Sequence, residues 1–328
     1  MQADAVVLNP KANAGAGAER WKLVRVSPLG RQLVLDRAPV FDGTGTVLSL
    51  DLAGFLREQL LRGARRFVIA GGDGTVNLVL SAYLRLCMSD LRMPRDARFG
   101  AVGIGSSNDF QKPFDAKGRA RVAGFACRLD FDHAFAHDVG TLETAETAET
   151  IPEQENRYFF VNASMGVTAE ANDRFNQGGR AFEFLKRRWV DGAIVAAALS
   201  TFAGYQNRKI RVQVGQGSQT ELLLTNLSVI KNRFFSGSFH YDQGQRADDG
   251  LLGVRMCSAM NRFEMLAALK GLASGKFSGR PKTSSGTATL VQVQSTDSTP
   301  LAIETDGEVM RATSCRFGIV PKGVVLCP

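Results

Sequence analysis

The first part of the chain alternates short apolar runs with segments whose apolar residues recur at helical spacing. The apolar runs lie at residues 6–8, 67–70 and 98–104, and the helical spacing is clearest at residues 51–61 and again after Thr75. Short apolar runs bounded by turn residues are typical of buried strands. Strands that alternate with helices predict βαβ units and a parallel sheet.

The second part follows a different pattern, in which strand-like runs are separated by Gly, Ser, Asn and Asp. These runs lie at residues 158–161, 209–214, 221–230, 251–256, 287–293 and 301–305, with helical segments at 180–205 and 262–272. Such a pattern predicts an antiparallel, β-rich region. The acidic, repetitive stretch at 141–156 is interpreted as a solvated loop or hairpin tip. A last pair of runs, at 316–320 and 324–327, fits either part.

We therefore predict an α/β fold with a parallel sheet over residues 1–140, followed by a β-sandwich-like domain over residues 141–328. The 328 residues are 44% hydrophobic and 22% charged, which suits a soluble globular protein. No apolar stretch reaches the ~18–20 residues of a membrane span, and the N-terminus lacks a secretory signal. Five scattered cysteines fit buried thiols in a reducing cytosol. A cytoplasmic protein is expected.

The net charge of +8, from 40 Lys and Arg against 32 Asp and Glu, favours anionic partners. Nucleotides, nucleic acids and acidic lipid surfaces all meet that description. The chain has no interleaved aromatic and basic residues of the kind single-strand binders use, and no zinc-finger spacing. We therefore expect a nucleotide or a lipid surface, and no nucleic acid.

The most informative motif is Gly71-Gly72-Asp73-Gly74-Thr75, which joins the run at 67–70 to the helix that follows. Glycines let backbone N–H groups approach an anion closely, and a helix N-terminus adds a favourable dipole. A carboxylate beside a phosphate is repulsive unless a cation such as Mg²⁺ lies between them. The motif predicts a nucleotide-phosphate loop. The alternative is a glycine-rich turn whose Asp73 only caps the helix.

Polar residues also follow the other two runs of the first part. Asn9 and Lys11 follow residues 6–8, while Asn108 and Asp109 follow residues 98–104. Ligands of parallel sheets bind at the carboxyl ends of the strands, so these residues are predicted to share one sheet edge. Lys11 fits either a phosphate contact or an exposed loop.

Seven motifs in this order resemble those of the diacylglycerol kinase catalytic family, which includes diacylglycerol, sphingosine and ceramide kinases and soluble bacterial relatives. The motifs are Asn9-Pro10-Lys11, Gly71-Gly72-Asp73-Gly74-Thr75-Val76-Asn77, Gly105-Ser106-Ser107-Asn108-Asp109-Phe110, Asp138-Val139-Gly140, Asn162-Ala163-Ser164-Met165-Gly166, Ala247-Asp248-Asp249-Gly250-Leu251-Leu252 and Asp306-Gly307-Glu308. The resemblance implies an α/β nucleotide-binding domain, a β-sandwich, an active site in the cleft between them, and transfer of the γ-phosphoryl group of ATP to a lipid hydroxyl.

The same resemblance implies roles for single residues. The expected ATP-binding residues are Asn9, Lys11, Gly71, Gly72, Asp73, Gly74, Thr75, Asn77, Ser106 and Asn108. Asp73, Asp109 and Asp138 would organise the catalytic Mg²⁺, and Asp73 would also count among the catalytic groups. For Asn77, packing of the helix is an equal alternative.

The general base implied by the resemblance is Asp306, with Glu308 in support. Taken alone, Asp306-Gly307 would be a hairpin turn, and a rigid turn can also present a carboxylate. Soluble bacterial relatives bind a structural divalent ion near Asp248 and Asp249. The alternative is two turn carboxylates without a metal, since two acids underfill a six-oxygen shell.

We expect a soluble lipid kinase that uses Mg²⁺ and ATP on a diacylglycerol-like or sphingoid- or ceramide-like lipid, and that associates peripherally with the inner face of the cell membrane. The cluster Arg187-Arg188-Trp189 fits an anionic membrane surface or a solvated helix face. A homodimer is one option for its assembly. The alternatives are an NAD kinase-like small-molecule kinase, which shares the glycine loop, and a nonenzymatic lipid- or nucleotide-binding regulator.

Overall fold

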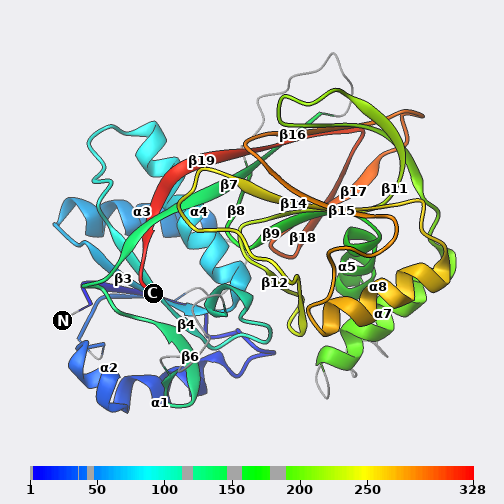
Figure 1. Cartoon of the computed structure of the whole chain (residues 1–328). Coiled ribbons are helices and arrows are strands. Elements are labelled where there is room, and N and C mark those ends of the chain that lie inside the picture. Colours follow the sequence, from blue (N-terminus) through cyan, green and yellow to red (C-terminus); the bar gives the residue numbers. More distant parts are fainter. Residues whose placement is uncertain (1–2, 36, 43–47, 113–120, 146–156, 178–189) are drawn as a thin grey trace. The chain divides into compact units, whose positions relative to one another are not determined.

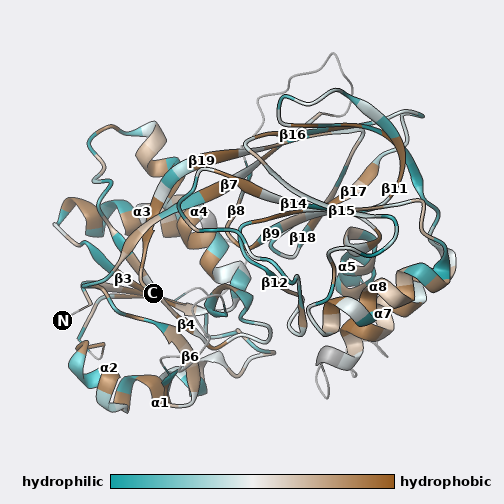
Figure 2. Cartoon of the chain, in the orientation of Figure 1, coloured by the Kyte–Doolittle hydropathy of each residue, from teal (hydrophilic) through white to brown (hydrophobic). Residues whose placement is uncertain are grey.

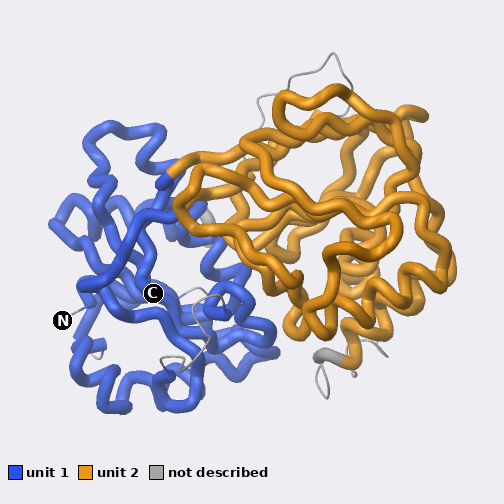
Figure 3. Tube along the Cα trace, viewed as in Figure 1, with its two compact units in different colours: residues 1–137, 322–328 blue, residues 138–321 orange. Residues whose placement is uncertain are grey.

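The computed structural model describes residues 3–35, 37–42, 48–112, 121–145, 157–177 and 190–328. The chain divides into two compact units (Figure 3). Unit 1 comprises residues 1–137 and 322–328, and unit 2 comprises residues 138–321. Each unit has its own apolar core.

Unit 1 is built on a parallel sheet in the order β2–β1–β3–β4. These strands span Val40–Asp42, Ala5–Leu8, Arg66–Gly71 and Arg98–Gly103. Strand β4 also pairs antiparallel with β6 (Phe125–Arg128), which pairs with β5 (Arg121–Val122). Every residue of β1, and all of β3 and β4 after their first arginine, is buried, as expected of a sheet covered on both faces.

Helices follow the strands of unit 1 in the predicted alternation (Figure 1). They are α1 (Gly17–Val26), α2 (Pro28–Gln32), α3 (Leu48–Leu61), α4 (Asp73–Ser89) and the short 3₁₀ helix η1 (Asp109–Gln111). Helix α4 buries a stripe that includes Val76, Val79 and Tyr83, and this stripe fixes its N-terminus at the end of β3. The expected α/β part with a parallel sheet is confirmed.

Unit 2 contains antiparallel strands around a second core, which agrees with the sandwich-like prediction. One run of neighbours is β18–β17–β9–β11–β14–β15, and another is β10–β16–β19–β7–β8. The bounds are β7 (Phe135–Ala145), β8 (Arg157–Phe159), β9 (Asn162–Gly166), β10 (Arg208–Val214), β11 (Thr220–Ile230), β14 (Leu252–Ser258), β15 (Thr283–Ala288), β16 (Val291–Ser295), β17 (Leu301–Thr305), β18 (Glu308–Ala312) and β19 (Ser314–Leu326). Strands β7 and β19 begin in one unit and end in the other.

Among the described residues, three helices and a small hairpin complete unit 2. The helices are α5 (Val167–Gln177), α7 (Val190–Gly204) and α8 (Arg262–Ala273), and the hairpin pairs β12 (Phe234–Phe235) with β13 (Phe239–His240). Helix α8 begins at a capping box, in which Asn261 accepts from the N–H of Glu264 and Glu264 accepts from the N–H of Asn261. These elements enclose a separate apolar cluster around Tyr241 and Phe277.

Several sequence predictions for unit 2 were wrong in detail. Residues 141–145 are not a loop but the end of β7, where Leu142 is buried; residues 146–156 lie outside the described residues. The single strand expected at 287–293 is two strands with a turn at Thr289-Leu290. The two final runs form one strand, β19.

The strand expected at 158–161 is interrupted for a physical reason. The N–H groups of Phe160 and Val161 donate to the carboxylate of Asp306 rather than to a neighbouring strand. The chain therefore leaves β8 at Phe159 and re-enters the sheet as β9 at Asn162. The predicted helix at 180–205 is described only from Val190 onward, so Arg187, Arg188 and Trp189 lie outside the described residues.

Candidate active site

The ends of β1, β3 and β4 surround an open polar cavity of about 330 Å³ in unit 1. Its lining combines Asn9, Ala12, Asn13, Gly72, Asp73, Gly74, Thr75, Gly105, Ser106 and Ser107. The predicted meeting of three loops at one sheet edge is therefore observed. Four lining residues were not predicted as site residues: Ala12 and Asn13 of the loop after β1, and Gly105 and Ser107 of the loop after β4.

Helix α4 points its N-terminus at this cavity. Its first residue is Asp73, and its N-cap is Gly72, which has no side chain to satisfy the first N–H groups of the helix. An uncapped N-terminus of a 17-residue helix is favourable for an anion, because N–H groups and the helix dipole act together. Asn9 closes the opposite side by donating from Nδ2 to Oγ1 of Thr75 at 3.0 Å.

Asp73 links the first glycine loop to the second loop. Its Oδ2 accepts from the N–H of Asp109 at 3.0 Å, and its Oδ1 accepts from the N–H of Phe110 at 2.8 Å. Asp73 therefore holds the start of η1, and this use of both oxygens explains why a carboxylate can lie inside a glycine loop. The geometry assigns Asp73 a positioning role between the two loops.

The second loop is fixed by its own side chains and by one unpredicted arginine. Asn108 has a left-handed φ of 52°, and its side-chain amide pairs with both the N–H and the C=O of Gly105 at 3.1 Å. Arg20 of α1 donates to the carbonyls of Ile104 and Gly105 at 3.0 and 3.1 Å. Asn108 thus shapes the loop, and no local sequence pattern marks Arg20.

Four predicted ATP-binding residues do not line the cavity. Gly71 lies in β3, where an added Cβ would overlap the side chain of Thr75. Lys11 is exposed, and Asn77 accepts from Oγ of Ser81 one turn later in α4 at 3.2 Å. Asn108 supports the loop from behind. For all four residues a direct contact with a nucleotide stays a prediction.

Unit 2 carries a second polar site at the turn between β17 and β18. Asp306 has a left-handed φ of 45°, and its carboxylate accepts three backbone N–H groups, from Phe160 at 2.8 Å and from Val161 and Asn162 at 3.0 Å. Backbone donors favour the ionised form of a carboxylate. The turn predicted at Asp306-Gly307 is confirmed, and a catalytic role for its carboxylate stays a prediction.

A buried glutamate, which the sequence did not reveal, supports this turn. Glu304 is 2% exposed; it accepts from Oγ of Ser164 at 2.7 Å and from the N–H of Gly307 at 2.6 Å. Glu308, predicted to assist Asp306, is exposed at the start of β18. Glu304 is thus the residue that braces the turn, although every residue of β17 is buried and the strand pattern gave no sign of it.

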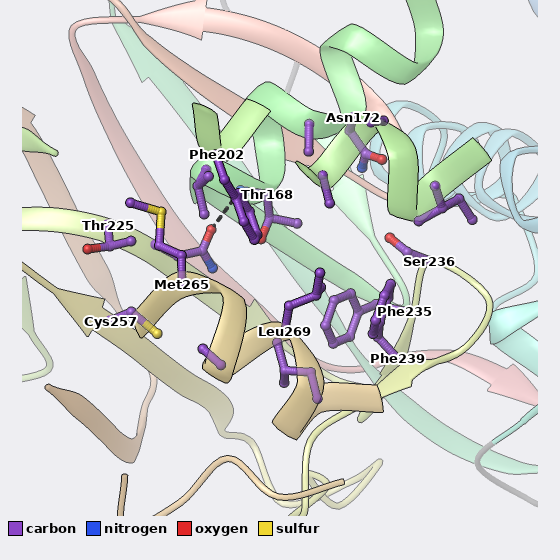
Figure 4. Close-up of a pocket in the computed structure, with 18 of the residues that line it drawn as sticks. Thr168, Asn172, Phe202, Thr225, Phe235, Ser236, Phe239, Cys257, Met265 and Leu269 are labelled. Carbon is purple, nitrogen blue, oxygen red and sulfur yellow. Dashed lines mark hydrogen bonds between the residues drawn. The ribbon is translucent and has the colours of Figure 1, made fainter. Parts of the chain in front are cut away.

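Unit 2 also contains an apolar cavity of about 80 Å³ between α5, α7, α8 and the β12–β13 hairpin (Figure 4). Phe202, Phe235, Phe239, Met265 and Leu269 form much of its wall. Its polar edge is satisfied internally: Asn226 accepts from the N–H of Thr168 at 3.0 Å and donates to Oγ of Ser228 at 3.1 Å.

The ionisable groups beside the cavity are held neutral. Burial raises the pKa of the Cys257 thiol to about 12, and it raises the pKa of the Tyr241 hydroxyl above its usual value. The cavity therefore favours an uncharged, hydrophobic occupant.

Both halves of the chain match known family models. Residues 5–129 match the diacylglycerol kinase catalytic domain, and residues 162–327 match the YegS C-terminal domain, which is described as NAD kinase β-sandwich-like. The chain belongs to the YegS-like, diacylglycerol kinase catalytic-domain family. The family resemblance drawn from the ordered motifs is confirmed.

A probable lipid kinase described as YegS-like, from Shewanella frigidimarina, is 21% identical over 288 residues, which cover 84% of this chain and 80% of that protein. The structure of a diacylglycerol kinase from Bacillus anthracis has a TM-score of 0.65 at 13% identity, and it covers all of this chain and 97% of that chain. A second structure from the same organism has a TM-score of 0.71 at 14% identity, over all of this chain and 98% of that one. At this identity the structures show a shared fold.

The family implies a magnesium ion, which would need acidic side chains as ligands. Among the described residues there is no group of three or more His, Cys, Asp and Glu side chains that could hold a metal. Asp109 is buried against Nζ of Lys112 at 2.5 Å, and Asp138 of unit 2 pairs with Lys231 at 3.1 Å. This arrangement does not form a preassembled metal site. It fits a metal that arrives with a nucleotide, since Mg²⁺ is usually bound by few carboxylates together with phosphates and water.

None of the described helices is long and apolar enough to cross a bilayer. All five cysteines are buried and unbonded to one another, as predicted. His133 pairs with Asp130 at 2.8 Å, and His137 lies near Arg128.

Proposed function

We propose that this chain is an ATP-dependent lipid kinase that transfers the γ-phosphoryl group to the hydroxyl of a diacylglycerol-like or sphingoid- or ceramide-like lipid. The observation that carries the proposal is the apolar cavity of unit 2, which lies in the same unit as the Asp306 turn. Membership in a family of lipid kinases supports the reaction class.

Unit 1 supplies the groups that would hold the nucleotide. Phosphoryl transfer depends mainly on positioning and charge neutralisation. The N-terminus of α4 and the hydroxyls of Thr75 and Ser106 face the polar cavity, and they would bind phosphate oxygens. Mg²⁺ bound with the nucleotide would neutralise the charge that develops on the transferred group.

Unit 2 supplies the group that would activate the acceptor. In the proposed step the lipid hydroxyl oxygen forms a bond to the γ-phosphorus, the bond from that phosphorus to the β,γ-bridging oxygen breaks, and ADP leaves. The proton of the hydroxyl passes to the carboxylate of Asp306. Three backbone N–H groups orient this carboxylate. Both units must therefore contribute to one ternary complex.

Helices α7 and α8 suggest where the lipid surface would be met. From Gly192 to Gly204 helix α7 has no charged residue, yet Val195 and Leu199 are 38% and 45% exposed. On α8, Phe263 and Leu266 are 84% and 47% exposed. Figure 2 shows α7 as almost wholly brown or pale.

A helix that is apolar on every face normally contacts another apolar phase on each side. One side of α7 and of α8 lines the cavity, and we assign the exposed side to a bilayer. The net charge of +8 would favour an anionic membrane. An acyl chain could then pass from the bilayer into the cavity without crossing water.

The proposal is tested by incubating the full chain with radiolabelled ATP, Mg²⁺ and a panel of lipids in mixed micelles. The expected result is Mg²⁺-dependent label in the organic phase, in the product of one lipid class. Label in NADP instead would favour the NAD kinase alternative. A complete lack of transfer to any acceptor, with ATP still bound, would favour a nonenzymatic regulator.

A further inference from the structure

Lys231 directly follows β11 and buries its ammonium group in a cage of oxygens within unit 2. Nζ donates to Oδ2 of Asp138 at 3.1 Å and to the carbonyls of Arg246 and Leu251 at 2.8 Å each. Oδ1 of Asp249 lies 3.5 Å away. The side chains of Lys231 and Asp138 are 4% and 0% exposed, so this is an interior site.

The cage has the composition of a site for a hard cation. Ca²⁺ and Mg²⁺ are bound by carboxylate and backbone carbonyl oxygens, and a short loop often supplies several of them. Here Arg246, Asp249 and Leu251 supply a carbonyl, a carboxylate and a carbonyl within six residues, and Asp138 adds a second carboxylate from β7. Asp248, in contrast, is 40% exposed and lies beside Arg246 at 3.4 Å.

We infer that the ammonium group of Lys231 is the structural cation of this chain, and that it fills an oxygen cage that would otherwise take a divalent ion. An ammonium has three N–H donors, and three oxygens of the cage accept them. Two carboxylates around one ammonium also satisfy the requirement that a buried charge be paired. The divalent ion expected near Asp248 and Asp249 does not fit beside this lysine.

The backbone beside the filled cage contacts the segment that holds the neighbouring turn. The backbone N–H groups of Lys231 and Asn232 donate to the carbonyl of Val161 at 3.0 and 2.9 Å, and the N–H of Val161 donates to Asp306 at 3.0 Å. The main chain of Lys231 is therefore two hydrogen bonds away from the Asp306 carboxylate. This inference concerns the stability of unit 2, and it stands whether or not the chain is a kinase.

The test is thermal unfolding of the full chain, without nucleotide, in EDTA and in millimolar Ca²⁺ or Mg²⁺. The midpoint of the wild-type protein should be the same in all three conditions. Lys231→Ala leaves two carboxylates without their cation, and its midpoint in EDTA should fall by roughly 5–10 °C. Ca²⁺ should restore part of that loss, because the smaller side chain leaves room for a hydrated ion.

Two further variants make the test specific. In Lys231→Ala combined with Asp249→Asn, the response to Ca²⁺ should disappear. Lys209→Ala removes an exposed lysine of β10 and should change neither the midpoint nor the response to Ca²⁺. A Ca²⁺ response of the wild-type protein that Asp249→Asn abolishes would overturn the inference, and so would a Lys231→Ala protein that is destabilised but insensitive to Ca²⁺.

A direct measurement keeps the inference testable if Lys231→Ala does not fold. Elemental analysis of the wild-type protein, after dialysis against Ca²⁺ and Mg²⁺ and removal of free ions, should find no stoichiometric metal. One bound ion per chain that is lost in Asp249→Asn would show that the cage holds a metal rather than the lysine.

Discussion

The polar cavity of unit 1 and the Asp306 turn of unit 2 are formed by different kinds of chemical group. The cavity is made of backbone, glycines and small side chains from three loops, each of which follows its strand directly. The turn is made of side chains that reach across the fold: Asp306 holds residues 160–162, and Glu304 holds Ser164. A site of the first kind is local in sequence, whereas one of the second kind depends on the completed sandwich.

This difference predicts how each site fails. The backbone segments around the polar cavity are closely packed, so a substitution that adds side-chain volume between them should disturb this site most. A site held by side-chain carboxylates should be most sensitive to the loss of an acceptor oxygen, because an unsatisfied buried N–H is costly.

Asp306→Asn should have the largest effect, because it changes the proposed base and the clamp together. Loss of a general base costs roughly 10²–10⁴-fold in rate, and we expect a fall of about 10³-fold in kcat. The asparagine NH₂ would also face a backbone N–H, which should lower the free energy of unfolding by about 1–3 kcal/mol. Kinase rates and urea unfolding measure the two effects separately.

Asp297→Asn is the matched control for this variant. Oδ1 of Asp297 accepts from Oγ of Ser295 and from the N–H of Thr299, and an asparagine retains that oxygen. Hydrogen bonds from Thr299 and Ser295 lower the pKa of Asp297 to about 2, so this variant should leave the rate unchanged but lose some stability with the charge. If Asp306→Asn turns over at the wild-type rate, Asp306 is not the general base. If its urea unfolding midpoint is unchanged, the hydrogen bonds of the carboxylate do not stabilise the fold.

Gly105→Ala should damage nucleotide binding by unit 1. A Cβ at this position would overlap the Cα of Gly72 in the other loop, and two backbones cannot part without opening the cavity. Overpacking of this kind costs roughly 1–3 kcal/mol. If that cost falls on the nucleotide-bound state, ATP affinity should fall by about 10- to 100-fold. Calorimetric titration with ATP measures it.

Gly54→Ala in α3 provides the control, since a Cβ there meets nothing within 4 Å. It should leave affinity unchanged and raise stability slightly, because alanine favours a helix over glycine. Unaltered ATP affinity in Gly105→Ala would contradict the close approach of the two loops.

The same contrast explains how much could be predicted from the sequence. Strands β1, β3 and β4, helices α3 and α4, the glycine loop and the meeting of Asn9, Asp73 and Ser106 follow from local patterns. The remaining elements of unit 1 were not predicted: β2, β5, β6, α1, α2 and η1. Asp73 itself shows the limit, since its partners Asp109 and Phe110 lie 36 and 37 residues away. The motif identified the residue but not that its two oxygens hold the second loop.

Unit 2 was less predictable because its important contacts are long-range. Lys231 and Asp138 are 93 residues apart, and Glu304 and Ser164 are 140 apart. Neither Lys231 nor Glu304 stands in a pattern that distinguishes it from an ordinary residue of a strand. The apolar cavity could not be predicted from the sequence either. Its residues, such as Phe202, Phe235 and Met265, come from separate elements, each of which has the pattern of an ordinary core segment.

Ala268→Phe should affect the lipid and not the nucleotide. Ala268 is buried in α8 and lines the apolar cavity, so a phenyl ring would occupy space that we assign to an acyl chain. We expect about a 10-fold rise in KM for the lipid, equivalent to about 1.4 kcal/mol, with KM for ATP unchanged. Overpacking should also lower stability by roughly 1–3 kcal/mol.

Ala267→Phe places the same ring one residue earlier, on the exposed side of α8 that we assign to the bilayer, and should not raise either KM value. If Ala268→Phe turns over lipid with the wild-type KM, the cavity is not the acyl site. A parallel rise in both KM values would instead indicate general damage to the fold.

The smallest effect is expected at Asp4, where unit 1 uses a carboxylate clamp of the kind seen at Asp306, but at a partly exposed position. Burial by itself would raise the pKa of Asp4, yet the backbone N–H groups of Arg65 and Arg66 and the Arg66 guanidinium together hold it below the usual 3.8. The ionised form is therefore the one that stabilises the fold. The contribution of Asp4 to the free energy of unfolding is fully present above its pKa in the unfolded chain. It is lost as the pH falls through its lower pKa in the folded protein.

Asp4→Asn should accordingly cost about 0.5–1 kcal/mol at neutral pH, a modest value because both partners are partly exposed. The difference between variant and wild type should shrink as the pH falls to about 3 and below, where the wild-type carboxylate also becomes neutral. Urea unfolding across this range measures it, with Asp42→Asn as an exposed control in the same unit. A difference that does not change with pH would mean that Asp4 acts through shape rather than charge, and the parallel with the Asp306 clamp would then fail.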